Sequence, residues 1–202
     1  MTRIKICGLT RLEDLEFAIA LGANAVGLVI EPSSPRCVGL ADASRLLEAV
    51  PPYVSRVAVL GPFDAGPHLA SFDAVQAIGV RRSDLDPSQR AISVYRVGSG
   101  EKLPHADESD AVLLDAYVKE GFGGSGVKVD IEAAKALMAE IVRPVIIAGG
   151  LTPENVAEVV TSLRPFAVDV SSGVESEPRI KDKGKLRAFF DSVREADGTH
   201  VL

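Results

Sequence analysis

Two side chains that could move protons stand where apolar segments of the sequence end. Cys7 closes the segment of residues 4–7, and Asp115 closes the segment of residues 111–115. Read conservatively, such a cysteine is a small buried hydrophobe, and such an aspartate caps nearby backbone amides. If both instead face one cleft, they offer a base and an acid. Lys5, two residues before the thiol, could lower the pKa of Cys7.

Small residues follow two further apolar segments, residues 145–148 and residues 167–170. Glycine lets backbone N–H groups approach an anion closely, and the start of a helix adds a favourable dipole. The loops after the last two strands of a barrel often bind phosphate. The sequence therefore predicts a phosphate-binding site at Gly149, Gly150, Ser171, Ser172 and Gly173.

Three charged residues could support these groups. Side chains alternate along a strand, so Lys5 shares a face with Cys7, and Asp169 shares a face with Ser171. If that face is the interior, Asp169 is a buried charge that needs a partner, and Lys5 is the obvious candidate. Arg36 lies in the loop after residues 25–30, where its guanidinium could bind a carboxylate or phosphate, although an isolated loop arginine is commonly solvated.

Other polar residues give weaker signals. The glycine-rich segment of residues 121–126 could cover a ligand or act as a mobile lid, and its central residues are Gly123, Gly124, Ser125 and Gly126. The three histidines, His68, His105 and His200, do not stand at strand ends, which argues against histidine acid–base chemistry. Metal-ligand spacings and nucleotide-binding motifs are absent from the sequence. We therefore expect a reaction that uses no metal and no cofactor.

The apolar segments themselves predict strands of a parallel sheet. Most are continuous β-branched and aliphatic runs, the pattern of strands that are covered on both faces. They comprise residues 4–7, 25–30, 55–60, 74–78, 92–97, 111–115, 145–148 and 167–170. Helices are predicted at residues 12–21, 40–49, 130–141, 153–163 and 183–196, with Thr152 as the N-cap of the fourth and Pro153 in its first turn.

Eight strand–helix units predict a single-domain α/β fold over residues 1–202, a (β/α)₈ TIM barrel with parallel strands. Residues 61–110 are poor in helix signal, so some middle crossover helices should be short or irregular. Residues 64–68 predict a broken crossover, and Gly100 and Pro104 reduce the fifth helix to little more than a turn. A doubly wound open sheet is the alternative.

Composition narrows the class of protein. Of 202 residues, 47% are hydrophobic and 25% are charged, which indicates a globular chain with a substantial core. A net charge of −6 argues against general binding to nucleic acid or to an anionic membrane. Two cysteines cannot form a disulfide framework, and neither a spanning segment nor a signal peptide is evident. We expect a cytoplasmic protein, a monomer or homodimer, that binds a small molecule.

The sequence resembles the phosphoribosylanthranilate isomerase family. The resemblance rests on the segments 5–10 (KICGLT), 22–27 (GANAVG), 34–36 (SPR), 113–115 (LLD) with 123–126 (GGSG), 148–156 (AGGLTPENV) and 164–175 (RPFAVDVSSGVE). They occur in the order of the family over residues 4 to about 180.

The resemblance implies an aldose–ketose isomerase of tryptophan biosynthesis. Its reaction would be the Amadori rearrangement of N-(5-phosphoribosyl)anthranilate to 1-(o-carboxyphenylamino)-1-deoxyribulose 5-phosphate. By matched position, Asp115 would be the general acid that opens the ribose ring, and Cys7 the general base that removes the C2 proton. Arg36 would hold the anthranilate carboxylate, while Gly149–Gly150 and Ser171–Gly173 would hold the phosphate.

Two other functions stay open. Ile78 stands where the family usually has a histidine, and residues 59–62 (VLGP) replace an aromatic residue and an asparagine. These differences favour a related phosphosugar isomerase whose substrate carries another amino substituent. The other reading is a non-catalytic phosphosugar-binding barrel, against which the presence of both Cys7 and Asp115 argues.

Overall fold

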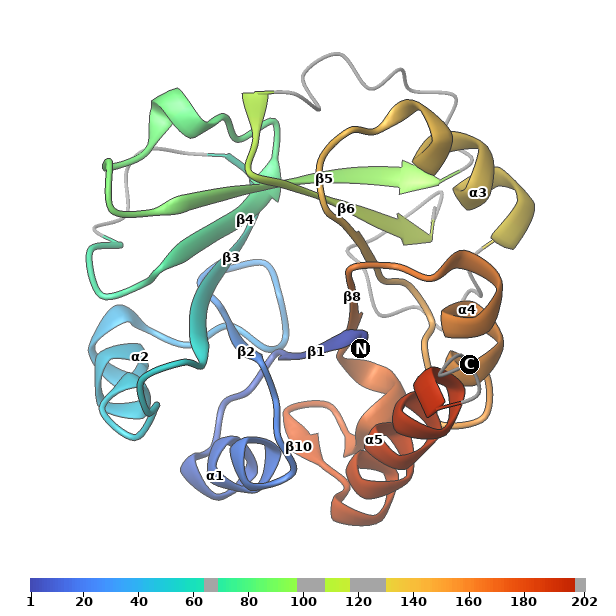
Figure 1. Cartoon of the computed structure of the whole chain (residues 1–202). Helices are drawn as coiled ribbons and strands as arrows, with labels where there is room; N and C mark the ends of the chain where they lie inside the picture. The colour runs from blue at the N-terminus through green and yellow to red at the C-terminus, as the bar shows by residue number, and fades with distance from the viewer. Residues whose placement is uncertain (64–68, 98–107, 117–129, 199–202) are drawn as a thin grey trace.

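Eight parallel strands close into a barrel in which each strand pairs with the next and β8 pairs with β1 (Figure 1). The computed structural model describes residues 1–63, 69–97, 108–116 and 130–198. The strands are β1 (Arg3–Cys7), β2 (Ala25–Val29), β3 (Ser55–Pro62), β4 (Ala74–Ile78), β5 (Arg90–Val97), β6 (Ala111–Ala116), β7 (Val145–Ile147) and β8 (Ala167–Val170). The predicted (β/α)₈ barrel is confirmed, and the open sheet is excluded.

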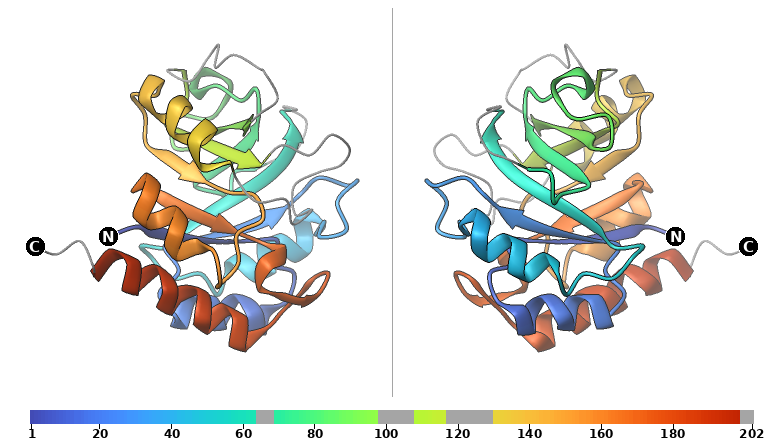
Figure 2. Two further views of the ribbon diagram at one scale, coloured as in Figure 1. Left: turned by 90° about the vertical axis from the view of Figure 1, so that its right-hand side faces the viewer. Right: turned by 90° about the vertical axis from the view of Figure 1, so that its left-hand side faces the viewer.

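Helices cover the outside of the barrel beside β1, β2 and β8, and one further helix lies next to the ends of β5 and β6 (Figures 1 and 2). They are α1 (Leu12–Ala20), α2 (Leu40–Leu47), α3 (Ile131–Glu140), α4 (Val156–Leu163) and α5 (Lys183–Gly198), and each corresponds to a predicted helix. Between β3 and β6, the described residues include the short 3₁₀ helix η1 (Arg82–Asp84). Residues 64–68 and most of the predicted fifth crossover lie outside the described residues.

The start of α4 differs from the prediction. Thr152 does not cap this helix, because the N-cap residue is Asn155. The backbone N–H of Thr152 donates to Oδ1 of Asn155 over 2.8 Å, and Nδ2 of Asn155 donates to the carbonyl of Gly150 over 2.9 Å. These bonds close a turn that keeps Pro153 outside the helix and ties the start of α4 to the end of β7.

A short hairpin after β8 is absent from the sequence prediction. The chain leaves β8 through the 3₁₀ helix η3 (Ser172–Val174), and then forms the antiparallel strands β9 (Glu175–Glu177) and β10 (Ile180–Lys181) before α5 begins. Lys181 lies opposite Glu175 in this pair. The hairpin therefore brings two oppositely charged residues together beside the end of β8.

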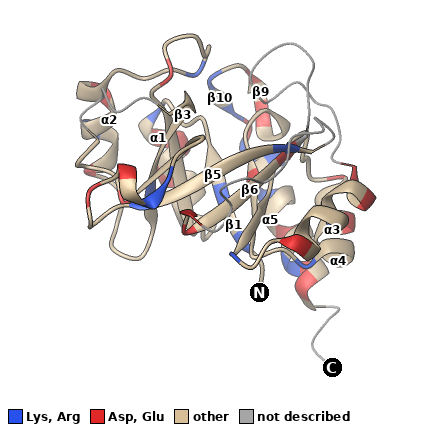
Figure 3. Ribbon diagram, turned by 90° about the horizontal axis from the view of Figure 1, so that it is seen from above, with Lys and Arg blue, Asp and Glu red and all other residues tan. Residues whose placement is uncertain are grey.

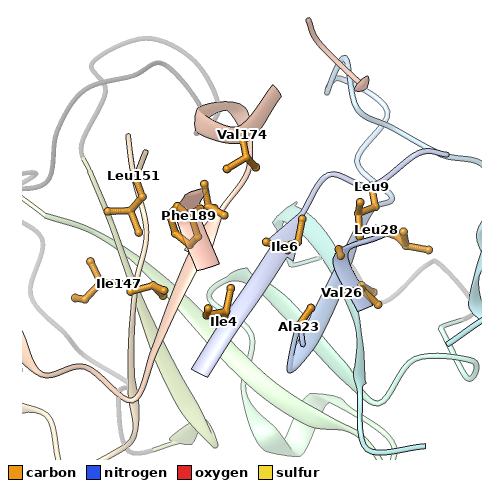
Figure 4. Close-up of a cluster of buried hydrophobic side chains, with 14 of the residues drawn as sticks. Ile4, Ile6, Leu9, Ala23, Val26, Leu28, Ile147, Leu151, Val174 and Phe189 are labelled. Carbon is orange, nitrogen blue, oxygen red and sulfur yellow. The ribbon is translucent and has the colours of Figure 1, made fainter. Parts of the chain in front are cut away.

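Apolar side chains on the two faces of the strands form two separate cores. The outer core fills the space between strands and helices and includes Ile6, Leu28 and Phe189 (Figure 4). The inner core fills the barrel and consists of Val57, Ala74, Ile92, Leu113, Ile146, Ala148 and Ala167. Because both faces of each strand are buried, most strands read as continuous apolar runs instead of alternating ones.

Every second residue of a strand faces the interior of the barrel. These inward-facing residues are apolar in the inner core and become polar at the carboxyl ends of the strands. On β5 the inward series is Ile92, Val94 and Arg96, and on β6 it runs from Leu113 to Asp115. The register pairs Arg96 with Asp115, so two charged residues stand side by side at this end of the barrel. Polar chemistry is thus concentrated where the strands end, as expected for a barrel of this class.

Charged residues of both signs are spread over the helices and loops (Figure 3). Among the described residues, no helix has the length and apolar character that crossing a membrane requires.

Candidate active site

A cleft lies at the carboxyl ends of the barrel strands. The structure brings most of the predicted site residues to this one cleft. Its lining includes Cys7, Asp115, Arg36, Asp169, Gly149, Gly150, Ser171, Ser172 and Gly173. Lys5 lies beneath the cleft, next to Asp169. The glycine-rich residues Gly123, Gly124, Ser125 and Gly126 lie outside the described residues.

Lys5 and Asp169 form a buried ion pair beneath the thiol of Cys7. Lys5 Nζ donates to Asp169 Oδ2 over 2.8 Å, and the two side chains are 4% and 5% exposed. Strand register places these residues opposite each other on β1 and β8. On the other side, Gly27 of β2 leaves room for the lysine and the thiol. A Cβ at Gly27 would lie 3.0 Å from Lys5 Nζ and 3.2 Å from Cys7 Sγ.

Burial and charge act in opposite directions on these groups. Burial raises the pKa of the Cys7 thiol, and the positive charge of Lys5 offsets this only in part, so the pKa lies above its ordinary value. The prediction that Lys5 would depress the pKa of Cys7 is therefore wrong in its net result, because burial outweighs the lysine. Burial also lowers the pKa of Lys5, but the charges and hydrogen bonds of Asp169 and Cys7 together outweigh burial, so this pKa lies above its ordinary value.

The loops after β7 and β8 meet at the predicted phosphate site. Gly149 and Gly150 have φ values of +94° and +60°, a left-handed conformation that glycine adopts without strain. Gly173 lies so close to the β7 loop that a Cβ there would stand 1.8 Å from the carbonyl oxygen of Leu151. Glycine is thus required at this contact, which joins the two loops into one surface.

Arg36 reaches the cleft over Gly8, the residue that follows Cys7. Gly8 has a φ of +70°, and a Cβ there would lie 2.6 Å from Cδ of Arg36. Nε of Arg36 donates to Oε1 of Glu175 over 2.8 Å, and Nη2 donates to Oε2 over 2.6 Å. The hydrogen bonds to Glu175 raise the pKa of the Arg36 guanidinium above its ordinary value.

Asp115 lies on the other side of the cleft from the β1 strand that carries Cys7, and it is half-buried. Between them, on the side of β3 to β5, the cleft lining is largely apolar. This wall contains Val59, Leu60, Ile78 and Val94. A flat hydrophobic group would fit against it, because apolar surface is removed from water on binding.

Several polar residues of the cleft are not among the sequence predictions. Gln76 and Arg96 line it, and the alternation Ile92, Val94, Arg96 would have indicated an inward guanidinium. Among the described residues, Gln76 Oε1 and Asp169 Oδ1 are the buried side-chain nitrogen or oxygen atoms without a hydrogen-bond partner. Glu175, which contacts Arg36, was also missed. The two residues are 139 positions apart in the sequence, and no local pattern indicates such a contact.

The closed barrel and the polar cleft at the carboxyl ends of its strands define an enzyme of the (β/α)₈-barrel class. A sequence model described as N-(5'phosphoribosyl)anthranilate (PRA) isomerase matches residues 4–192. The chain belongs to the phosphoribosylanthranilate isomerase family, whose members are isomerases of tryptophan biosynthesis.

Individual relatives agree with this assignment over nearly their whole length. The N-(5'-phosphoribosyl)anthranilate isomerase of Geotalea daltonii is 38% identical over 211 residues, which cover 98% of this chain and 100% of the relative. The crystal structure of phosphoribosyl anthranilate isomerase from Thermus thermophilus matches with a TM-score of 0.84 and 36% identity, over 96% of this chain and 99% of that one. A relative crystallised in complex with reduced 1-(o-carboxyphenylamino)-1-deoxyribulose 5-phosphate has a TM-score of 0.81 and 32% identity, over 96% of this chain and 100% of its own.

Proposed function

We propose that this protein converts N-(5'-phosphoribosyl)anthranilate to 1-(o-carboxyphenylamino)-1-deoxyribulose 5-phosphate, with Asp115 as general acid and Cys7 as general base. The observation that carries the proposal is that this thiol and this carboxyl group line one cleft together with the paired glycine loops after β7 and β8. The substrate needs an acid, a base and a site for its phosphate, and one cleft offers all three.

The reaction consists of ring opening, removal of a proton from C2 and a final tautomerisation. Asp115 donates a proton to the ring oxygen as the bond between that oxygen and C1 breaks, and the nitrogen lone pair forms a C1=N double bond. Cys7, as thiolate, then removes the proton from C2. The electrons of the C2–H bond form a C1=C2 double bond, and the electrons of C1=N return to nitrogen. The resulting enolamine takes up a proton at C1 while its C2 hydroxyl loses one, and the electrons of the O–H bond form the C=O double bond of the ketone.

The rest of the cleft would hold the substrate in place for these steps. The backbone of Gly149 and Gly150 and the turn of Ser171 to Gly173 would bind the phosphate, and Arg36 would bind the anthranilate carboxylate. The aromatic ring would lie against the apolar wall of β3 to β5. The unpaired acceptor atoms of Gln76 and Asp169 suit the hydroxyl groups of the ribose, which are hydrogen-bond donors.

The Lys5–Asp169 pair would act on the base from below. A buried thiol resists ionisation, and the positive charge of Lys5 favours its thiolate form. Asp169 in turn keeps Lys5 charged and in place. Lys5 is therefore a positioning and electrostatic residue in this proposal, whereas Cys7 touches the substrate.

Turnover of freshly prepared N-(5'-phosphoribosyl)anthranilate, followed by the loss of its fluorescence, tests the proposal. Cys7→Ala and Asp115→Asn should each lower kcat by about 10²–10⁴-fold, the usual contribution of a general acid or base. Cys37→Ser and Asp42→Asn are matched controls, because Cys37 is half-buried outside the cleft lining and Asp42 is exposed on α2; both should stay within about twofold of the unaltered protein.

Two results would contradict the proposal. If the unaltered protein binds the reduced product analogue but turns nothing over, the chain is a binding barrel. If it converts another aminoaldose 5-phosphate faster than the anthranilate compound, its substrate differs from that of its relatives, and the replacements at Ile78 and residues 59–62 become the first place to look.

A further inference from the structure

The guanidinium of Arg36 is held in one orientation by a charged cluster that involves the β9–β10 hairpin. Glu175 accepts two hydrogen bonds from Arg36, at 2.8 Å from Nε and 2.6 Å from Nη2. The side chains of Arg36 and Glu175 are 13% and 5% exposed, so water competes little for these bonds. A bidentate pair fixes the plane of the guanidinium as well as its position.

Glu175 is itself fixed by the hairpin that carries it. Lys181 Nζ donates to Oε1 of Glu175 over 2.9 Å and to the carbonyl of Ser171 over 3.0 Å. The backbone N–H of Lys181 donates to Oδ2 of Asp14, and Lys185 Nζ donates to the carbonyl of Glu175. Glu175 is therefore held by Arg36 from the loop after β2, by Lys181 from its own hairpin and by Lys185 from α5.

The charges of the cluster leave a net positive group at the cleft. Arg36, Lys181 and Lys185 carry three formal positive charges, and Glu175 and Asp14 carry two formal negative charges. Burial lowers the pKa of Lys181, and the charge of Glu175 acts against this. Burial raises the pKa of Glu175, but the hydrogen bonds and charges of Arg36 and Lys181 together outweigh burial, so this pKa lies below its ordinary value and the carboxyl group is ionised at neutral pH. Both bonds from Arg36 to Glu175 use Nε and Nη2. Within the part of the chain that the structure describes, Nη1 makes no such bond and can reach a ligand in the cleft that Arg36 lines.

We propose that Glu175 is the positioning residue for substrate recognition: it holds Arg36 so that the guanidinium binds the carboxylate on the aromatic ring of the substrate. This inference rests on the proposed function, because it needs a substrate with such a carboxylate. Lys181 adds a positive charge next to this pair. Without that charge the Arg36–Glu175 pair would be neutral and would attract an anion less strongly.

A merely structural role for Glu175 predicts something different. If the glutamate only pins the hairpin to the barrel, its loss weakens every ligand of the cleft to the same extent. If it positions Arg36, its loss weakens ligands that carry the carboxylate and spares ligands that lack it. Comparing two ligands on the same folded variant separates the two roles, and it does so even where a variant is less stable.

The probes are reduced 1-(o-carboxyphenylamino)-1-deoxyribulose 5-phosphate and the same compound without the o-carboxyl group. Dissociation constants are measured by titration calorimetry on the full chain. In the unaltered protein the carboxylated ligand should bind about 10–100-fold more tightly, as expected for a desolvated charge-assisted contact. Glu175→Gln and Glu175→Asp should each reduce this ratio about tenfold or more, with the ligand that lacks the carboxyl group changing by less than about threefold.

The variants are chosen to keep the result interpretable. Glu175→Asp retains the charge that pairs with Lys181 but is one methylene too short to reach both guanidinium nitrogens. Glu177→Gln is the matched control, because Glu177 is exposed on the same strand, and it should leave the ratio unchanged. In an Arg36→Gln background the ratio should be low already, and Glu175→Gln should not lower it further.

The inference is overturned if Glu175→Gln and Glu175→Asp keep the ratio of the unaltered protein, whatever they do to absolute affinity. It is also overturned if Arg36→Gln leaves the ratio unchanged. A different result identifies failure of the proposed function itself: the unaltered protein then neither turns over N-(5'-phosphoribosyl)anthranilate nor prefers the carboxylated ligand.

Discussion

Replacing Asp169 by Asn should destabilise the protein strongly, because it leaves the charge of Lys5 buried without its partner. The two side chains are 4% and 5% exposed, and their charged atoms are 2.8 Å apart. Breaking a buried ion pair in this way costs about 3–5 kcal/mol. For a chain of this length each kcal/mol corresponds to about 2–4 °C in Tm, so Asp169→Asn should lower Tm by about 6–20 °C.

Removing both charges should restore most of this loss. In Lys5→Met/Asp169→Asn no buried charge is left unpaired, so the double variant should be more stable than Asp169→Asn alone. Asp73→Asn is the control: Asp73 pairs with Arg56 at 2.6 Å, but these side chains are 43% and 38% exposed, so it should cost only about 0–1 kcal/mol. Urea unfolding at pH 7, followed by circular dichroism, measures all three. The reasoning is refuted if Asp169→Asn costs no more than Asp73→Asn, or if the double variant is no more stable than the single one.

Three further predictions follow from the site. Because burial raises the pKa of Cys7 above its ordinary value and the base acts as thiolate, kcat/KM should rise about tenfold per pH unit between pH 6 and pH 8. A profile that is flat over this range would exclude Cys7 as the base. Gly173→Ala should raise KM at least about tenfold and lower stability by about 1–3 kcal/mol, because its Cβ would meet the carbonyl of Leu151. The control is Gly198→Ala, which has open space and should change neither KM nor stability. Kinetics and thermal melts of both variants check this prediction. The pKa of Glu175 is lowered in the folded protein, so its ionised form adds stability above its unfolded pKa of about 4.3, and this stability is lost as pH falls through the folded value. Between about pH 5 and pH 3, Glu175→Gln should therefore lose less stability than the unaltered protein in urea unfolding. Equal losses would contradict the lowered pKa.

Much of the fold could be predicted because the strands carry one simple signal. Each inner strand of the barrel is buried on both faces, so it reads as a continuous apolar run, and the structure begins and ends these strands within two residues of the prediction. The start of α4 could not be predicted, because several side chains can bond to the same backbone amides. At α4 the side chain of Asn155 closes a turn that moves the helix start from residue 153 to Val156.

Only those site residues could be predicted that alternation along a strand or the residue types of a loop indicate. Alternation places Lys5 and Asp169 on the inner face, and the structure pairs them. The sign of the net pKa shift at Cys7 could not be predicted, because it depends on how deeply the folded barrel buries the thiol. The link between Arg36 and Glu175 was likewise invisible, since a hairpin with no strong strand signal of its own brings the glutamate back to the loop after β2.

A crystal structure of this protein with reduced 1-(o-carboxyphenylamino)-1-deoxyribulose 5-phosphate tests the central claim most directly. We predict Sγ of Cys7 within about 3.5 Å of C2 and the carboxyl group of Asp115 in hydrogen-bond contact with the oxygen that closes the ring in the substrate. The phosphate should lie on the loops after β7 and β8. A ligand bound with its phosphate elsewhere, or with Cys7 and Asp115 both remote from C1 and C2, would contradict the account.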